Sequence, residues 1–153
     1  MSNILEICQN LPQQRFEEGE TIIHEEVRDG RLFVLKEGSV EILKKGVRIN
    51  TVSSKGVVLG EVSFLLDRPH ITSVKALEPC QCYVCDDPLE FLTAHPEMNL
   101  YIARMLANRL NAVTEYLVEL SDQVDENNAD SADSGIADAV LKSIMQHYSN
   151  KSL

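Results

Sequence analysis

The sequence predicts a mainly β domain with flanking helices. Six of the seven glycines fall between residues 19 and 60, and short runs rich in β-branched and aromatic residues lie between them. Short strands separated by glycine turns at even spacing are typical of an antiparallel barrel, roll or sandwich. A helical apolar pattern precedes this region, and a long stretch without glycine follows it. At 153 residues the chain has the length of one domain with additional segments.

The individual elements follow in order. Residues 2–11 carry apolar side chains at helical spacing, and Pro12 ends the predicted helix. Glu37-Gly38 and Lys44-Lys45-Gly46 predict turns between strands. Residues 74–86 are expected to be extended. The other predicted strands are 21–23, 32–35, 39–43 and 47–52.

Three of the four cysteines are close together in the sequence, as Cys80, Cys82 and Cys85, with Cys8 apart from them. In extended chain Cys80 and Cys82 share one face, and Cys85 lies on the other. A zinc site usually needs four converging ligands, often as two C-x-x-C pairs, and no second cluster is present in the sequence. Buried structural thiols are therefore favoured, with a metal or redox sensor as the alternative.

The net charge and the hydropathy of the sequence argue against some classes of protein function. The formal net charge of −10 argues against a nucleic-acid-binding surface, which needs clustered Lys and Arg. No apolar run reaches membrane-spanning length, and the N-terminus lacks the pattern of a signal peptide. We expect a cytoplasmic protein, and free thiols suit that reducing compartment.

Pro96 opens a long predicted helix whose apolar positions form a heptad seam, stepping by three and four residues from Ala103 to Val124. A narrow seam of this period favours a coiled-coil homodimer. The alternative is a single amphipathic helix that packs on its own β domain. We expect a domain over 1–121, an acidic linker over 122–135 and an amphipathic helix over 136–153, which docks on its own domain or on a partner protein. Residues 122–153 are too short and too acidic for a DNA-binding helix-turn-helix.

The stretch from Gly60 to Val74, GEVSFLLDRPHITSV, resembles the phosphate-binding cassette of the cyclic-nucleotide-binding domain family, which includes the catabolite activator protein and the regulatory subunits of protein kinase A. Phe16, Gly19 and Ile22, and then the run from Gly30 to Val40, resemble the upstream signature of the same family. The resemblance covers residues 5 to 120. It implies an eight-stranded antiparallel, jelly-roll-like β-roll with an N-terminal helix and a long C-terminal helix.

The resemblance also implies a ligand site. Glu61 would bind the ribose 2′-hydroxyl, while Ser63 and the backbone N–H groups at the start of a short helix would bind the cyclic phosphate. The apolar Ile71 favours cAMP over cGMP, because cGMP-selective members place Thr or Ser there. Thr114 aligns with a base-contacting position of the long helix. The complete predicted set is Gly60, Glu61, Val62, Ser63, Arg68, His70, Ile71, Thr72 and Thr114.

His70 departs from the family pattern, which has Arg at this position. Arg gives a permanent charge and a planar fork for two phosphate oxygens, whereas His gives one donor and is charged only when protonated. Loss of a charge-assisted bond to a buried anion costs about 1.5–3 kcal/mol, or roughly ten- to a hundredfold in affinity. Arg68, two residues earlier, is the candidate substitute.

Two hypotheses follow. The first is a stand-alone cAMP-binding regulatory module that signals by repositioning the long helix. The second is a domain that has lost its nucleotide and acts in dimerisation or protein interaction. Catalysis is disfavoured: the four histidines include no H-x-H pair of a cupin metal site, and the sequence contains no P-loop or Ser/His/Asp arrangement. No metal cofactor is expected.

Overall fold

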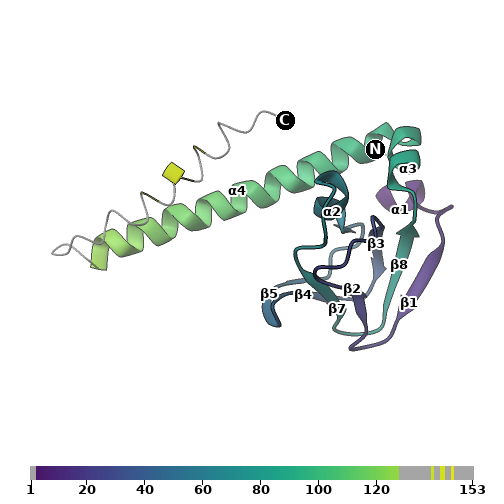
Figure 1. Cartoon of the computed structure of the whole chain (residues 1–153), viewed down its shortest axis with the longest axis horizontal. Helices are drawn as coiled ribbons and strands as arrows, with labels where there is room; N and C mark the ends of the chain where they lie inside the picture. Colours follow the sequence, from purple (N-terminus) through teal and green to yellow (C-terminus); the bar gives the residue numbers. More distant parts are fainter. Residues whose placement is uncertain (1–2, 128–138, 140–141, 144–145, 147–153) are drawn as a thin grey trace. The chain divides into compact units, whose positions relative to one another are not determined.

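The computed structural model describes residues 3–127, 139, 142–143 and 146 (Figure 1). It contains two compact units, Met1–Ile102 and Ala103–Leu153.

The first unit is built on two four-stranded antiparallel sheets (Figure 1). One sheet has the strand order β1-β8-β3-β6 and the other β2-β7-β4-β5. The eight-stranded, mainly β fold with flanking helices is therefore confirmed. The elements are α1 (Ile4–Ile7), β1 (Gln13–Phe16), β2 (Thr21–Ile23), β3 (Leu32–Glu37), β4 (Val40–Lys44), β5 (Val47–Val52), β6 (Val58–Leu59), α2 (Glu61–Leu65), β7 (Ser73–Ala76), β8 (Cys80–Cys85), α3 (Pro88–Ala94) and α4 (Pro96–Asn127).

The N-terminal helix is shorter than predicted. The Asn3 side chain accepts a hydrogen bond from the Leu5 N–H and starts α1, which spans only Ile4–Ile7. The chain then continues to Leu11 through turns, in which the Leu11 N–H bonds to the Cys8 carbonyl. The helical spacing over ten residues therefore corresponds to one short helix followed by turns, and Cys8 is the buried residue of this segment.

The core lies between the two sheets. Alternate residues of several strands, such as Phe33 and Leu35 of β3, belong to this core. The rings of Phe16 and Phe33 meet edge to face with centroids 6.3 Å apart. Cys80 and Cys82 belong to this core cluster, whereas Cys85 faces away from it toward α3. All four cysteines are free and buried, as expected for structural thiols. Within the described residues no cluster of three or more His, Cys, Asp or Glu could hold a metal ion.

Gly60 joins β6 to α2 and has φ of 90°. A Cβ atom there would lie 2.7 Å from the Arg31 carbonyl oxygen and 3.3 Å from Cε1 of His70. This position therefore requires glycine both for its left-handed backbone and for its close packing.

α4 is a continuous helix of 32 residues. Its first turns belong to the first unit, where Met98 and Ile102 are buried and the Tyr101 hydroxyl donates to the Gly56 carbonyl at 2.8 Å. In the second unit most large apolar side chains of α4 are exposed, namely Leu110, Val113, Tyr116, Val118 and Leu120. None of the helices in the described part of the chain is long and apolar enough to cross a membrane.

The end of α4 departs from the predicted boundary at residue 121. The helix runs to Asn127 and so includes the start of the predicted linker over 122–135. An acidic, solvated composition is compatible with an exposed helix as well as with a loop. The rest of the linker lies outside the described residues, as does most of the predicted helix over 136–153. Its described positions, Ala139, Lys142, Ser143 and Gln146, are helical and exposed.

The buried thiols predict a loss of stability at alkaline pH. Burial, with a smaller contribution from Cys80, raises the pKa of Cys82 from 9.0 to about 12. The folded state therefore keeps a proton that the unfolded state releases, so this stabilisation is complete below pH 9 and declines as the pH rises toward 12.

We expect the free energy of unfolding, measured with urea under reducing conditions, to fall from pH 8 to pH 10. The fall should be shallower in Cys82→Ala. Val84→Ala, which also opens a cavity in β8, should keep the wild-type slope; equal slopes in both variants would contradict this account.

Replacement of Gly60 by alanine is expected to destabilise the fold more than replacement of another glycine with positive φ. Gly19 also has a positive φ, of 86°, but nothing lies within 4 Å of a Cβ placed on it. Alanine at either position carries left-handed strain of order 1–3 kcal/mol, and only at Gly60 is a backbone clash added. Urea unfolding should therefore show a larger loss for Gly60→Ala than for Gly19→Ala. Equal losses would mean that the contact with Arg31 relaxes freely.

Candidate functional site

α2 begins the candidate site directly after β6. The Gly60 carbonyl accepts the first helical hydrogen bond from the Phe64 N–H at 3.2 Å. Glu61 and Ser63 occupy the first turn and are both buried. The Ser63 hydroxyl donates to the Arg68 carbonyl, so this side chain closes the loop that follows α2.

That loop is fastened to the connection between β2 and β3. Arg28 forms an ion pair with the Asp67 carboxylate at 2.6 Å and also donates to the Asp67 carbonyl. The His70 N–H donates to the Val27 carbonyl at 3.0 Å, and the Glu26 N–H donates to the His70 carbonyl at 2.8 Å. His70 therefore pairs with the connection through both backbone groups.

The His70 side chain is fixed to the same connection. Its imidazole is 3% exposed, and Nε2 lies 2.8 Å from Oδ1 of Asp29, whose side chain is 29% exposed. The same Asp29 oxygen accepts from the Arg31 N–H at 3.1 Å. The residue predicted to replace the phosphate Arg is thus buried against Gly60 and hydrogen-bonded to a carboxylate.

The far end of the cassette is held by a lysine. The Lys44 ammonium donates to the Ile71 carbonyl at 2.6 Å and pairs with Oε1 of Glu25, also at 2.6 Å. The hydrogen bond from Lys44, helped by the Lys45 N–H, lowers the pKa of Glu25. The Glu25 N–H in turn donates to the Ser73 hydroxyl at 2.9 Å. Ile71 itself is 40% exposed, and Thr72 is half-buried.

The structure brings together only part of the predicted set. Gly60 packs on the His70 ring, and the buried Glu61 and Ser63 follow it in α2. Val62 is half-buried and Arg68 is exposed. Thr114 lies in the second unit, where its hydroxyl donates to the Leu110 carbonyl of the same helix.

The sequence alone does not identify Asp29 as a residue of the site. It lies 41 residues before His70 and belongs to no motif. Followed by Gly30, it indicates only a turn.

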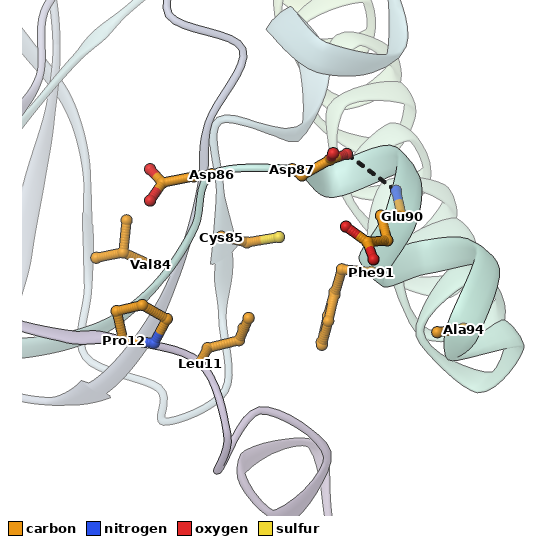
Figure 2. A pocket seen from close by; sticks show the side chains of 9 residues that line it. All are labelled: Leu11, Pro12, Val84, Cys85, Asp86, Asp87, Glu90, Phe91 and Ala94. Atoms are coloured by element: carbon orange, nitrogen blue, oxygen red, sulfur yellow. Dashed lines mark hydrogen bonds between the residues drawn. The ribbon is translucent and has the colours of Figure 1, made fainter.

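A cavity of about 320 Å³ lies between the β1–β8 side of the sheet and α3 (Figure 2). Leu11, Cys85 and Phe91 point into it, and none of the predicted site residues lines it. Carboxylates stand at its edge: Asp86 pairs with Arg31 at 2.7 Å, and Asp87 caps α3. This acidic edge is unfavourable for an anionic nucleotide.

The chain is similar in sequence to several known proteins. Over 80 residues the chain is 29% identical to the cAMP-dependent protein kinase regulatory subunit of Yarrowia lipolytica, with 52% of this chain and 21% of that protein covered. Over 83 residues it is 30% identical to the cGMP-dependent protein kinase egl-4 of Caenorhabditis elegans, with 54% and 10% covered. The chain therefore spans about a fifth or less of these relatives.

The fold of the chain is also similar to that of a solved structure. The crystal structure of the Thermus thermophilus catabolite activator protein matches 76% of this chain and 57% of its own, with a TM-score of 0.65 and 20% identity. Residues 13–88, from β1 to the start of α3, match the family model named cyclic nucleotide-binding domain. Through these residues, the chain belongs to the cyclic nucleotide-binding domain family.

Proposed function

We propose that this chain is a regulatory domain that binds a cyclic nucleotide, cAMP in preference to cGMP. The observation that carries the proposal is the arrangement of the cassette: the buried Glu61 opens α2 directly after Gly60, and His70 packs against that glycine. A ribose hydroxyl needs a hydrogen-bond acceptor and a phosphate needs donors, and the start of α2 would supply both.

Each part of the nucleotide has a proposed partner. The backbone N–H groups at the start of α2 would donate to the cyclic phosphate, as donors at a helix start do. Glu61 would accept from the ribose 2′-hydroxyl. His70 would supply the further donor that Arg supplies in the family pattern, and the exposed Arg68 would add a screened positive charge.

The preference for cAMP rests on Ile71. Its apolar, exposed side chain has no hydroxyl for the guanine amino group. The names of the relatives include both a cAMP-dependent and a cGMP-dependent kinase, so this preference is a proposal about this chain's own residues. Thr114 is the proposed contact to the base.

α4 is the proposed output element. The helix begins within the first unit, where Met98 and Ile102 are buried, and continues into the second. Ligand binding would change its position through different affinities for two states of the domain. The seam from Ala103 to Val124 would pair two copies as a homodimer. We place the protein in the cytoplasm and assign it a regulatory, non-catalytic role, with residues 136–153 available to a protein partner.

A second candidate is a nucleotide-free interaction module. The hydrogen bonds of the cassette favour it: the His70 ring is bound to Asp29, and the Ser63 hydroxyl to the Arg68 carbonyl. Both donors therefore have protein acceptors already, and a phosphate would have to compete with them. In this alternative the exposed apolar face of α4 carries the function.

Isothermal titration calorimetry with cAMP, cGMP and 5′-AMP separates the two candidates. We expect the full chain to bind cAMP more tightly than cGMP, and 5′-AMP least. His70→Arg should raise the affinity for cAMP roughly ten- to a hundredfold, because the charge-assisted bond is restored. Glu61→Gln should weaken binding by removing the charged acceptor, whereas Glu17→Gln, an exposed carboxylate outside the cassette, should not. Absence of binding up to millimolar cAMP in both the wild type and His70→Arg would overturn the proposed function and leave the interaction module.

Light scattering after size exclusion tests the dimer. Leu117 lies on the heptad seam, while Val118 is an exposed apolar residue beside it. We expect a dimeric mass for the wild type and for Val118→Glu, and a monomeric mass for Leu117→Glu, because two charged residues would face each other across the seam. A monomeric wild type, or identical behaviour of the two variants, would rule out pairing through this seam.

A further inference from the structure

We propose that Asp29 is a positioning residue that makes binding of the cyclic phosphate depend on protonation of His70. This inference rests on the proposed nucleotide site and assigns to it a residue that carries no motif. It starts from a single contact: Nε2 of the buried His70 ring lies 2.8 Å from Oδ1 of Asp29.

The contact with Asp29 determines which nitrogen of the His70 ring remains available to a ligand. A carboxylate can only accept, so Nε2 must carry a proton and donate to Asp29. The other nitrogen, Nδ1, makes no hydrogen bond within the part of the chain that the structure describes. Cε1, which is bonded to both nitrogens, lies 3.3 Å from a Cβ placed on Gly60. Nδ1 therefore lies beside the start of α2, where the phosphate is proposed to bind.

The protonation state then decides what Nδ1 offers. In the neutral ring with a proton on Nε2, Nδ1 carries a lone pair and repels an anion. Only the doubly protonated ring donates from both nitrogens, to Asp29 on one side and to a phosphate oxygen on the other. Because the phosphate and Asp29 are both acceptors, binding of the anion favours uptake of one proton.

Asp29 has two opposed electrostatic effects. Its negative charge stabilises the protonated ring, and the same charge repels the incoming phosphate. Other charged groups of the site are Glu61 on α2, Arg68 in the loop before His70, and Arg31, whose guanidinium pairs with Asp86. Glu26 contacts His70 through its backbone N–H, and Arg28 is paired with Asp67. Of the ion pairs found in the described residues, only that with Asp29 involves the His70 ring.

Asp29→Asn is the informative variant. The amide oxygen still accepts from the Arg31 N–H, which preserves the turn, while the negative charge is removed. Wild-type affinity for cAMP should fall with rising pH, by at most about tenfold per pH unit, the limit for uptake of one proton. Asp29→Asn should change this dependence: the ratio of its cAMP affinity to that of the wild type should differ between pH 6 and pH 8, because the charge that favours the protonated ring is removed. A purely structural role would weaken binding by the same factor at every pH.

Calorimetry on the full chain at pH 6, 7 and 8 provides the test, with each titration at pH 7 repeated in buffers of different ionisation enthalpy to count protons. We expect uptake of up to one proton by the wild type, a different number by Asp29→Asn and none by His70→Arg, whose guanidinium is always charged. Glu17→Gln, with the same change of charge outside the cassette, should retain the wild-type pH dependence.

The outcomes separate the inference from the proposed function. If cAMP binds but its affinity is independent of pH, or if Asp29→Asn keeps the wild-type slope, the role of Asp29 is wrong and the nucleotide site stands. If neither the wild type nor His70→Arg binds cAMP at any of the three pH values, both fall together. A ratio of wild-type to Asp29→Asn affinity that changes with pH, together with a different number of protons taken up by the variant, supports the inference.

Discussion

The cassette depends on the pairing of His70 with the connection between β2 and β3. Backbone hydrogen bonds to Glu26 and Val27, and the side-chain bond to Asp29, hold one residue at three points. Without this pairing the loop after α2 would have the Arg28–Asp67 ion pair as its main link to the same connection. That pair is exposed, and exposed ion pairs contribute little to stability. The buried His70 contacts therefore carry most of the restraint on the loop.

The same contacts also restrain the start of α2, because His70 packs against Gly60. The His70 ring lies against Gly60, and the Arg31 carbonyl lies so close to Gly60 that no Cβ fits between them. The start of α2 is thus held between the β2–β3 connection and the loop that follows the helix. Ser63 completes the closure by donating to the Arg68 carbonyl. The donors at the helix start are fixed before any ligand arrives, which reduces the ordering that binding would otherwise require.

The sequence predicts the fold far better than the contacts of the site. Glycine turns and strand-length apolar runs are local signals, so β3, β4 and β5 were found, whereas the two-residue β6 is too short to show a period. Acidic composition suggested a linker after residue 121, but an exposed helix satisfies the same pattern as far as Asn127. The cassette was found through its motif. Asp29 was not, because a contact across 41 residues leaves no mark on local spacing.

His70, in place of the Arg of the family pattern, changes which contacts the cassette needs in order to be stable without a ligand. A buried guanidinium needs a carboxylate or a bound phosphate to offset its loss of hydration, and without one it opposes folding. A neutral imidazole that donates to Asp29 is satisfied without a ligand, and its burial at 3% exposure is compatible with a stable empty cassette. At the proposed phosphate site the same bond would occupy one donor of the His70 ring, so ligand-free order and a lower affinity would have one cause. The proposed nucleotide would then bind through phosphate contacts added to the His70–Asp29 pair, and its affinity would depend on the contacts that remain available beside that pair.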